Sequence, residues 1–130
     1  DGATLGLATC YDIRFPELFR ALADQGASVT LLPASWGAGP GKVDQWQLLV
    51  RARALDATTF VLAADQADPA SRGIDAGTAP RGVGHSLAVS PFGVTLDELG
   101  SEPGLLVVDV DPEQIADVRA ALPVLANRRL

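Results

Sequence analysis

The stretch Gly6-Leu-Ala-Thr-Cys-Tyr-Asp-Ile-Arg-Phe-Pro-Glu17 predicts a strand, a turn and a helix in direct succession. Residues 4–9 form an apolar run that fits a buried strand, and Pro16 suits the first turn of a helix over residues 15–25. Cys10, the one cysteine of the chain, lies between them. The positive end of a helix favours thiolate, the reactive form of cysteine, so this position suits a nucleophile. A lone cysteine is also commonly an inert, buried side chain.

Outward from this stretch, strands and helices alternate at first, and strands then follow one another. Apolar and β-branched runs predict further strands at residues 28–32, 58–64, 84–90, 94–96 and 105–110. Helical spacing of apolar residues predicts a helix over residues 43–57. This order of elements predicts an α/β arrangement in the first part of the chain and mainly antiparallel strands in the later part. No linker interrupts it, so residues 1–130 are predicted to belong to one domain.

Prolines and aspartates mark the ends of several elements. Pro33 is expected to stop the second strand. Asp111, followed by Pro112 and by Gln114, predicts the capped start of a last helix that Pro123 ends. Residues 65–83 hold scattered charges with several glycines and prolines, which predicts a long irregular loop, and such loops often carry function.

The octapeptide Cys10-Tyr-Asp-Ile-Arg-Phe-Pro-Glu17 resembles the cysteine motif of the nitrilase superfamily, the carbon–nitrogen hydrolases. The resemblance continues in the family's order through Pro33-Ala-Ser-Trp36, Trp46 with Arg51-Ala-Arg53-Ala, Gly84-His-Ser86 with Pro91-Phe-Gly93, and Leu122-Pro-Val-Leu125 with Arg128-Arg129. It implies an α-β-β-α sandwich, of which residues 1–130 would be the C-terminal portion of a single domain, incomplete on its N-terminal side. An exposed sheet edge and an exposed core face would follow.

The same resemblance implies thiol-dependent hydrolysis of non-peptide C–N bonds. Cys10 would attack an amide or nitrile carbon, and the backbone N–H of Tyr11 would help to hold the oxyanion. Ammonia or an amine would leave, and water would hydrolyse the thioester; no cofactor is implied. The motif looks most like that of the amidase branches, ω-amidase and the Nit-type amidases, which suggests a small carboxylated amide as the substrate.

Family members resemble one another in a Glu–Lys–Glu–Cys set whose first three members precede the cysteine. Only nine residues precede Cys10, so we expect those three groups in a missing upstream half. Lys42, the only lysine, is a poor substitute because it follows Cys10 in a glycine-rich connection. The parent protein is therefore predicted to be the enzyme, and this chain alone is predicted to be inactive. The alternative is a non-catalytic fragment or degenerate homologue that acts as a binding or assembly module.

Other residues of the matched segments are candidates for the site. Asp12 and Arg14 could support it from the turn, or could simply form an ion pair with each other or with a neighbour. Glu17 either supports the site or only complements the helix dipole. Trp36 either forms a wall of the substrate pocket or covers the core.

Four other kinds of site fit the sequence less well. A Cys10/His85 dyad would give a thiol-protease-like alternative, in which cysteine precedes histidine. Ser86 lacks the final glycine of a nucleophile elbow. The glycine-rich residues 37–42 lack the spacing and the Ser or Thr of a phosphate loop. No zinc-like spacing exists, so no metal is predicted.

Composition limits the partners. The 130 residues carry a net charge of −6 and show no basic stripe, so nucleic acid and anionic membranes are poor partners. No apolar run approaches the about 20 residues of a membrane helix. A single cysteine cannot form an internal disulfide, which suits a reducing compartment and predicts a cytoplasmic protein. The family resemblance adds a homo-oligomer for the full-length protein.

Overall fold

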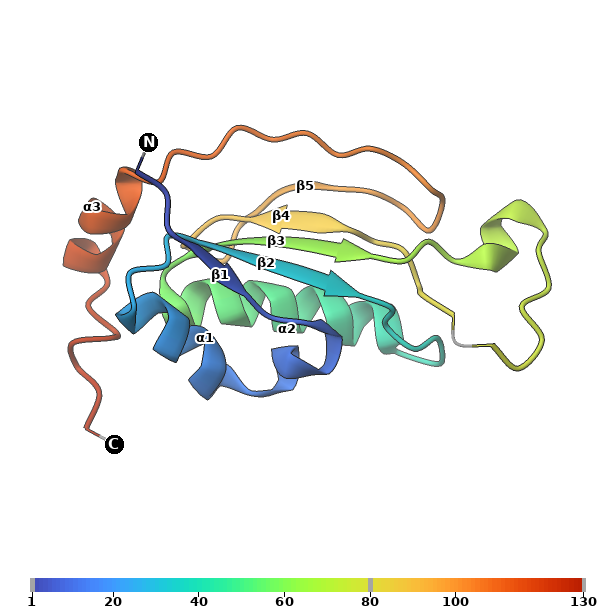
Figure 1. The fold of residues 1–130 in the computed structure, drawn as a ribbon, viewed down its shortest axis with the longest axis horizontal. Coiled ribbons are helices and arrows are strands. Elements are labelled where there is room, and N and C mark those ends of the chain that lie inside the picture. Colours follow the sequence, from blue (N-terminus) through green and yellow to red (C-terminus); the bar gives the residue numbers. More distant parts are fainter. Residues whose placement is uncertain (1, 80, 130) are drawn as a thin grey trace.

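The computed structural model describes residues 2–79 and 81–129, which form one β-sheet with two helices packed along one face (Figure 1). The strands are β1 (Leu5–Leu7), β2 (Val29–Ala34), β3 (Phe60–Asp65), β4 (Leu87–Val89) and β5 (Thr95–Glu98). The α-helices are α1 (Pro16–Asp24), α2 (Lys42–Ala57) and α3 (Gln114–Ala121), and the 3₁₀ turns are η1 (Cys10–Arg14) and η2 (Pro69–Arg72).

Within the described residues the sheet has five strands in the spatial order β1-β2-β3-β4-β5. Strands β1, β2 and β3 are parallel, and α1 and α2 make the connections between them. Strands β4 and β5 then pair antiparallel. This confirms the predicted α/β architecture, in which a parallel first half precedes an antiparallel second half.

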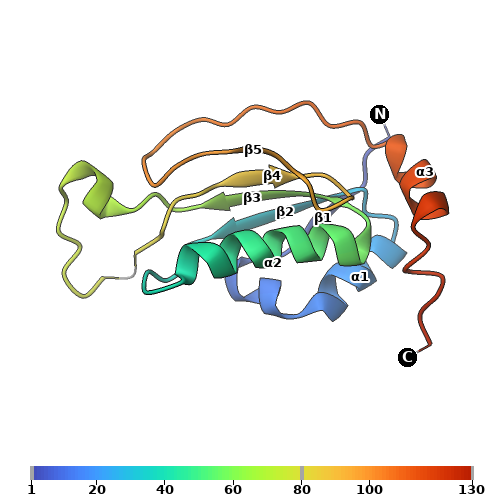
Figure 2. The ribbon, with the colours of Figure 1, turned by 180° about the vertical axis from the view of Figure 1, so that it is seen from behind.

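The main core lies between the sheet and the helices α1 and α2, which lie side by side (Figure 2). Successive residues of a strand point to opposite faces, so alternate residues of β3 enter this core. Val61 and Ala63 do so and are buried. From the helices, the core receives the buried side chains of Phe19, Ala23, Trp46, Val50, Ala54 and Ala57.

The opposite face of the sheet has much less cover. A small cluster of Val29, Phe60 and Ile115 places α3 at one end of this face. An extended segment, residues 104–110, runs across the rest of the face without joining the sheet (Figure 1). We call this side of the sheet the open face.

The predicted strand over residues 105–110 is not formed. The segment is extended but unpaired, and Leu105 and Val107 are 86% and 77% exposed. Strand propensity describes how a side chain fits a half-buried pleated surface, and a ladder also requires a neighbouring backbone. The segment passes over the face of the sheet and pairs with neither edge strand, β1 or β5.

Several predicted boundaries also differ, among them the start of β4, which was predicted at residue 84 and lies at Leu87. Strand β2 continues through Pro33 to Ala34, because β1 pairs only with residues 29–31 and Pro33 has a strand neighbour on the β3 side alone. A residue without an N–H is tolerated where one side of the strand is unpaired. Helix α3 begins at Gln114, and the Asp111 carboxylate accepts the N–H of Glu113 in the turn before it, at 3.0 Å. In the described residues, we find no helix with the length and hydropathy needed to cross a membrane.

Candidate functional site

Cys10 opens the η1 turn, three residues after the end of β1, where the chain bends sharply. Its φ of +47° lies in the left-handed region, which residues other than glycine rarely adopt. Backbone strain of this kind is concentrated at functional sites. The side chain is half-buried. Helix α1 begins at Pro16 as predicted, but η1 separates it from Cys10, so the amides that directly follow the sulfur-bearing residue belong to a 3₁₀ turn.

The sulfur has a polar contact with the residue that follows β2. Cys10 Sγ lies 3.9 Å from the carbonyl oxygen of Ser35, at the outer limit of an S–H···O contact. Ser35 Oγ donates in turn to Gln66 Oε1 at 3.0 Å. The carboxyl ends of β1, β2 and β3 therefore meet at Cys10, and ligands of open α/β sheets bind at such an edge.

Tyr11 and Asp12 continue the turn. The Tyr11 ring is 63% exposed and meets the edge of the Phe15 ring at 5.7 Å. Its backbone N–H has no acceptor among the hydrogen bonds of residues 2–79 and 81–129, and its role toward an oxyanion stays a prediction. The Asp12 carboxylate accepts the N–H of Thr9 at 2.9 Å, which closes the turn around Cys10.

Arg14 does not form an ion pair with Asp12 or any other described residue, so that simpler interpretation is wrong. Its guanidinium carbon lies 4.9 Å from the centre of the Trp36 ring, and Nη2 donates to Gln45 Oε1 at 3.2 Å. A cation over an aromatic face is stabilised by the ring quadrupole. Arg14 thus ties the cysteine turn to the β2–α2 connection and to α2.

Trp36 is 3% exposed and packs against Trp46, with ring centres 5.6 Å apart. Its Nε1–H donates to the Lys42 carbonyl at 2.9 Å, and Lys42 Nζ lies 5.4 Å from the ring centre. In this structure Trp36 is therefore a core residue beside the cysteine turn, and a role in the substrate pocket stays a prediction.

Glu17 lies on the outer side of α1, where its side chain is 73% exposed and 3.7 Å from Arg20. Both line a polar depression of about 450 Å³ with Asp24, Arg128 and Arg129. Arg128 bridges to Asp24 in this depression, through contacts of 2.7 and 2.8 Å. The structure brings Glu17 to these surface charges, and its support of the site stays a prediction.

Arg53 holds the cysteine turn from α2, a contact that was not singled out from the sequence. The side chain is buried, its Nε–H donates to the Ile13 carbonyl at 2.7 Å, and Nη1 pairs with Asp56. Burial lowers the pKa of Arg53 from its usual value, and the charge of Asp56 opposes that effect. The guanidinium satisfies a carbonyl in the middle of η1, so α2 and η1 are coupled.

His85 is engaged elsewhere. Its Nδ1 lies 2.9 Å from Glu98 Oε1, and its carbonyl accepts the Nε1–H of Trp46 at 2.9 Å. These contacts favour a packing and hydrogen-bonding role over a dyad with Cys10. No group of three or more His, Cys, Asp or Glu side chains suited to a metal occurs in the part of the chain that the structure describes.

Asp65 is the residue that sequence reasoning misplaced. The sequence predicts it at the start of the irregular loop over residues 65–83, but it ends β3 and is 9% exposed. Oδ1 accepts the N–H of Trp36 at 2.7 Å and Oδ2 accepts the N–H of Val83 at 3.0 Å. Burial raises the pKa of this carboxyl, and the two N–H donors oppose the rise. Its place directly behind the apolar residues 60–64 was the available signal.

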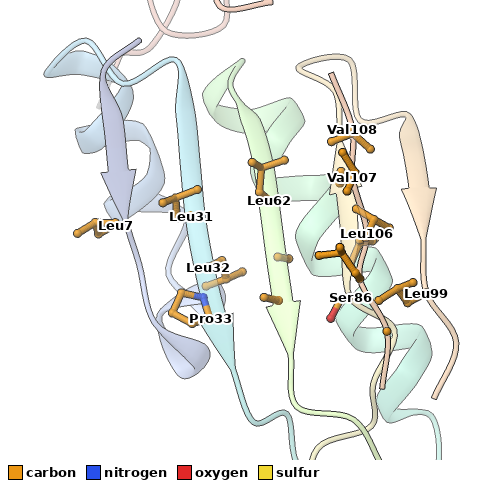
Figure 3. A pocket seen from close by; sticks show the side chains of 16 residues that line it. Leu7, Leu31, Leu32, Pro33, Leu62, Ser86, Leu99, Leu106, Val107 and Val108 are labelled. Atoms are coloured by element: carbon orange, nitrogen blue, oxygen red, sulfur yellow. The ribbon is translucent and has the colours of Figure 1, made fainter. Parts of the chain in front are cut away.

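The open face carries an apolar groove of about 710 Å³. Leu7, Leu31 and Leu62 project into it from β1, β2 and β3, and Leu106, Val107 and Val108 line its other side (Figure 3). Cys10 is not among its lining residues. The groove and the cysteine turn are therefore separate features of the described chain.

Comparison with known proteins gives a consistent result. Residues 1–120 match the sequence profile of the family described as Carbon-nitrogen hydrolase. The chain is similar to the deaminated glutathione amidase of Escherichia coli O157:H7, with 43% identity over 129 residues that cover 99% of this chain and 45% of that protein. The chain spans about half the length of the curated relatives it matches.

Two solved structures share the fold. Nit3 from Saccharomyces cerevisiae, a member of branch 10 of the nitrilase superfamily, matches with a TM-score of 0.81 and 32% identity, over 97% of this chain and 44% of that chain. A variant of the amidase from Nesterenkonia sp. AN1 matches with a TM-score of 0.75 and 34% identity, over 98% of this chain and 42% of that chain. That structure shows covalent addition of the acetamide moiety of fluoroacetamide at the active site cysteine.

Proposed function

Because this chain belongs to the carbon–nitrogen hydrolase family, we propose that it carries the nucleophile of a thiol-dependent amidase. The observation that carries the proposal is the position of Cys10. The residue is half-buried, on a left-handed turn, at the carboxyl edge of three parallel strands. The acetamide adduct on the active site cysteine of the similar Nesterenkonia amidase supports the same chemistry.

In the proposed reaction, the Cys10 thiolate forms a C–S bond to the amide carbon, and the carbonyl electron pair moves onto oxygen. The unpaired N–H of Tyr11 stabilises that oxyanion, and one such donor is typically worth about 2.7–4 kcal/mol of barrier. Collapse of the tetrahedral intermediate breaks the C–N bond, and the leaving nitrogen takes up a proton. Water then hydrolyses the thioester to a carboxylic acid and regenerates the thiol.

The proton-transfer groups are not assigned to this chain. The Glu–Lys–Glu members of the family pattern have no counterpart among residues 1–130. Turnover is therefore proposed for the protein that also contains those groups, and this chain alone is proposed to react with a thiol reagent without turnover. No cofactor enters the proposal.

A small carboxylated amide is the proposed substrate, as in the ω-amidase and Nit-type branches. Similarity to the E. coli deaminated glutathione amidase supports an amidase of this kind. A nitrile is the alternative electrophile that the same thiol could attack. A homo-oligomer in the cytoplasm completes the proposal for the full-length protein.

A second candidate is a non-catalytic binding or assembly module. The open face favours it, because an apolar groove and exposed side chains such as Leu105 form a surface suited to contact with another surface. The two candidates differ in one measurable respect, since a module would not release ammonia even when joined to its upstream residues.

Ammonia release from a panel of small amides and nitriles tests the first candidate. The whole protein that carries this chain is expected to release ammonia from at least one carboxylated amide, and Cys10→Ala is expected to reduce release to background. His85→Asn is the control, because the proposed reaction does not use the His85 ring. Absence of release from every compound, with no difference for Cys10→Ala, would remove the amidase. If the whole protein instead cleaved a peptide, and His85→Asn abolished that cleavage, the Cys10/His85 dyad would be favoured.

A further inference from the structure

Asp65 joins three segments that lie far apart in the sequence. Its two carboxylate oxygens accept separate backbone N–H groups, from Trp36 at 2.7 Å and from Val83 at 3.0 Å. Its own N–H donates to Ser86 Oγ at 3.0 Å. The amidase chemistry proposed above gives this buried carboxylate no part, although it lies one peptide away from the contact with Cys10.

That peptide is the bond between Ser35 and Trp36. Its N–H points to Asp65, and its carbonyl oxygen lies 3.9 Å from Cys10 Sγ. The bond is trans, so its N–H and C=O point in opposite directions from one rigid plane. Whatever fixes the direction of the N–H therefore fixes the direction of the carbonyl oxygen as well.

The surroundings leave Asp65 little freedom to move. Gly84 N–H donates to the Gln66 carbonyl at 2.9 Å, next to the contact of Val83. A Cβ at position 82 would overlap the Gln66 carbonyl oxygen, which shows how closely these segments cross. The carboxylate is thus held from one side while it holds the Ser35–Trp36 peptide on the other.

We propose that Asp65 is a positioning residue for Cys10: by accepting the Trp36 N–H, it keeps the Ser35 carbonyl oxygen against the sulfur and sets the reactivity of the thiol. The catalytic meaning of this role rests on the proposed amidase function, but the effect on the sulfur does not. A carbonyl oxygen can accept a bond from S–H and opposes the negative charge of a thiolate. Asp65 therefore acts on the sulfur through one rigid peptide plane.

Alkylation of Cys10 by iodoacetamide, followed across a range of pH, measures the effect without any amide substrate. The thiolate displaces iodide and forms a C–S bond, and the proton lost by the thiol goes to solvent. Asp65→Ala frees the Ser35–Trp36 peptide, so we expect alkylation at neutral pH to become about three- to tenfold faster, equivalent to one net hydrogen bond.

Asp65→Asn separates positioning from charge. An asparagine loses the negative charge but keeps one oxygen that can accept the Trp36 N–H. If Asp65 acts by positioning, Asp65→Asn alkylates at nearly the wild-type rate. If it acts only through its charge, Asp65→Asn alkylates as fast as Asp65→Ala, which overturns the proposal. The amide-proton shift of Trp36 identifies whether the asparagine oxygen accepts the Trp36 N–H in place of the carboxylate.

Glu98→Gln is the matched control, since Glu98 is another partly buried carboxylate, bonded to His85 and Gln47 rather than to the Ser35–Trp36 peptide. It is expected to leave the alkylation rate unchanged, and an equal acceleration there would also overturn the proposal.

The elements packed against η1 carry other charged groups, which all stay in place in these variants: Asp12, Arg14, Glu17, Arg20, Asp24, Lys42, Asp44, Arg51, Arg53 and Asp56.

Near-ultraviolet circular dichroism distinguishes a local effect from unfolding, because Trp36 and Trp46 pack together beside the site. If Asp65→Ala loses that signal, the alkylation rate of Asp65→Asn, compared with that of the wild type, tests the proposal instead. A wild-type rate in Asp65→Asn, with the asparagine oxygen still accepting the Trp36 N–H, supports positioning. A wild-type rate in a variant whose Trp36 N–H no longer bonds to residue 65 would overturn it. Failure of ammonia release in the whole protein would remove the amidase function and leave this result standing.

Discussion

The two faces of the sheet are built from equally apolar residues and differ in what covers them. On the helix side, α1 and α2 bury Val61, Ala63 and Leu87 almost completely. On the open face, Leu62 is only half-buried, and Leu7 is exposed. The sequence of β3 is almost continuously apolar, so both of its faces carry apolar side chains. Such continuous runs are typical of strands that are covered on both faces.

The difference shows that burial energy in this chain comes mainly from one side. Each Å² of apolar area removed from water contributes roughly 25 cal/mol to the free energy of folding. Side chains that remain exposed to solvent on the open face therefore contribute little to this free energy. The cysteine turn belongs to the well-covered side, because η1 contacts α1, α2 and β2. The candidate site is therefore held by the part of the molecule that is fully packed.

Truncation of the helix-side core is expected to have the largest effect. Trp46 is fully buried and also donates to the His85 carbonyl, so Trp46→Ala removes packing and leaves an acceptor unpaired. We expect a loss of about 3–5 kcal/mol in the free energy of unfolding. Urea titration measures it, with Leu105→Ala on the open face as the control, expected to change the stability by about 0.5 kcal/mol or less. Equal losses would show that the two faces contribute alike.

Loss of the Arg53 anchor is expected to come next. Arg53→Ala removes a charged hydrogen bond to the Ile13 carbonyl and leaves Asp56 without its partner. Because bonds to charged groups contribute about 1.5–3 kcal/mol, we expect a destabilisation in that range by urea titration. Arg51→Ala is the control on the same helix, an exposed arginine that donates to the Gly93 carbonyl, with an expected loss of about 0.5–1 kcal/mol. A smaller effect at Arg53 than at Arg51 would contradict the coupling of α2 to η1.

The sequence predicted what local chemistry decides. Pro16 starts α1 because its fixed φ suits a first turn, and the strand–turn–helix order around Cys10 follows from twelve consecutive residues. Residues 105–110 have the same kind of local signal for a strand and do not form one, because pairing needs a distant backbone. The end of β2 likewise depends on where β1 stops pairing, which Pro33 itself does not encode.

The candidate site shows the same division. Cys10 and its turn were predicted from their own neighbours, and the comparisons support the family to which the motif belongs. Asp65 was misplaced because its burial depends on Trp36 and Val83, which approach from 29 and 18 residues away. Arg14 was open to an ion pair with Asp12 or with another neighbour, and it contacts Trp36 and Gln45 instead. Contacts across the fold, and not local charge, decide these partners.

A change of pH is expected to have a smaller effect, centred on Asp65. Burial raises the pKa of its carboxyl above the ordinary value of 3.8, so the folded state holds the proton more tightly than the unfolded chain. Its stabilising contribution is therefore complete below that ordinary value and is lost as pH rises through the raised, folded-state pKa. Urea titrations at several pH values should show the stability of the wild type, relative to Asp65→Asn, falling as pH rises. A relative stability that rises with pH would contradict the sign.

The smallest expected change in stability comes from the open face itself. Leu105 and Val107 are exposed, so replacing both with glutamate should alter the free energy of unfolding by only about 0.5 kcal/mol. The same change should lower binding of the apolar dye ANS and reduce self-association in sedimentation, because exposed apolar patches drive both. Leu48→Glu is the control, since Leu48 is an exposed apolar residue on α2, away from the groove. If Leu48→Glu reduced dye binding as much as the double substitution, general surface hydropathy would explain the binding, and the contrast between the faces would lose its meaning.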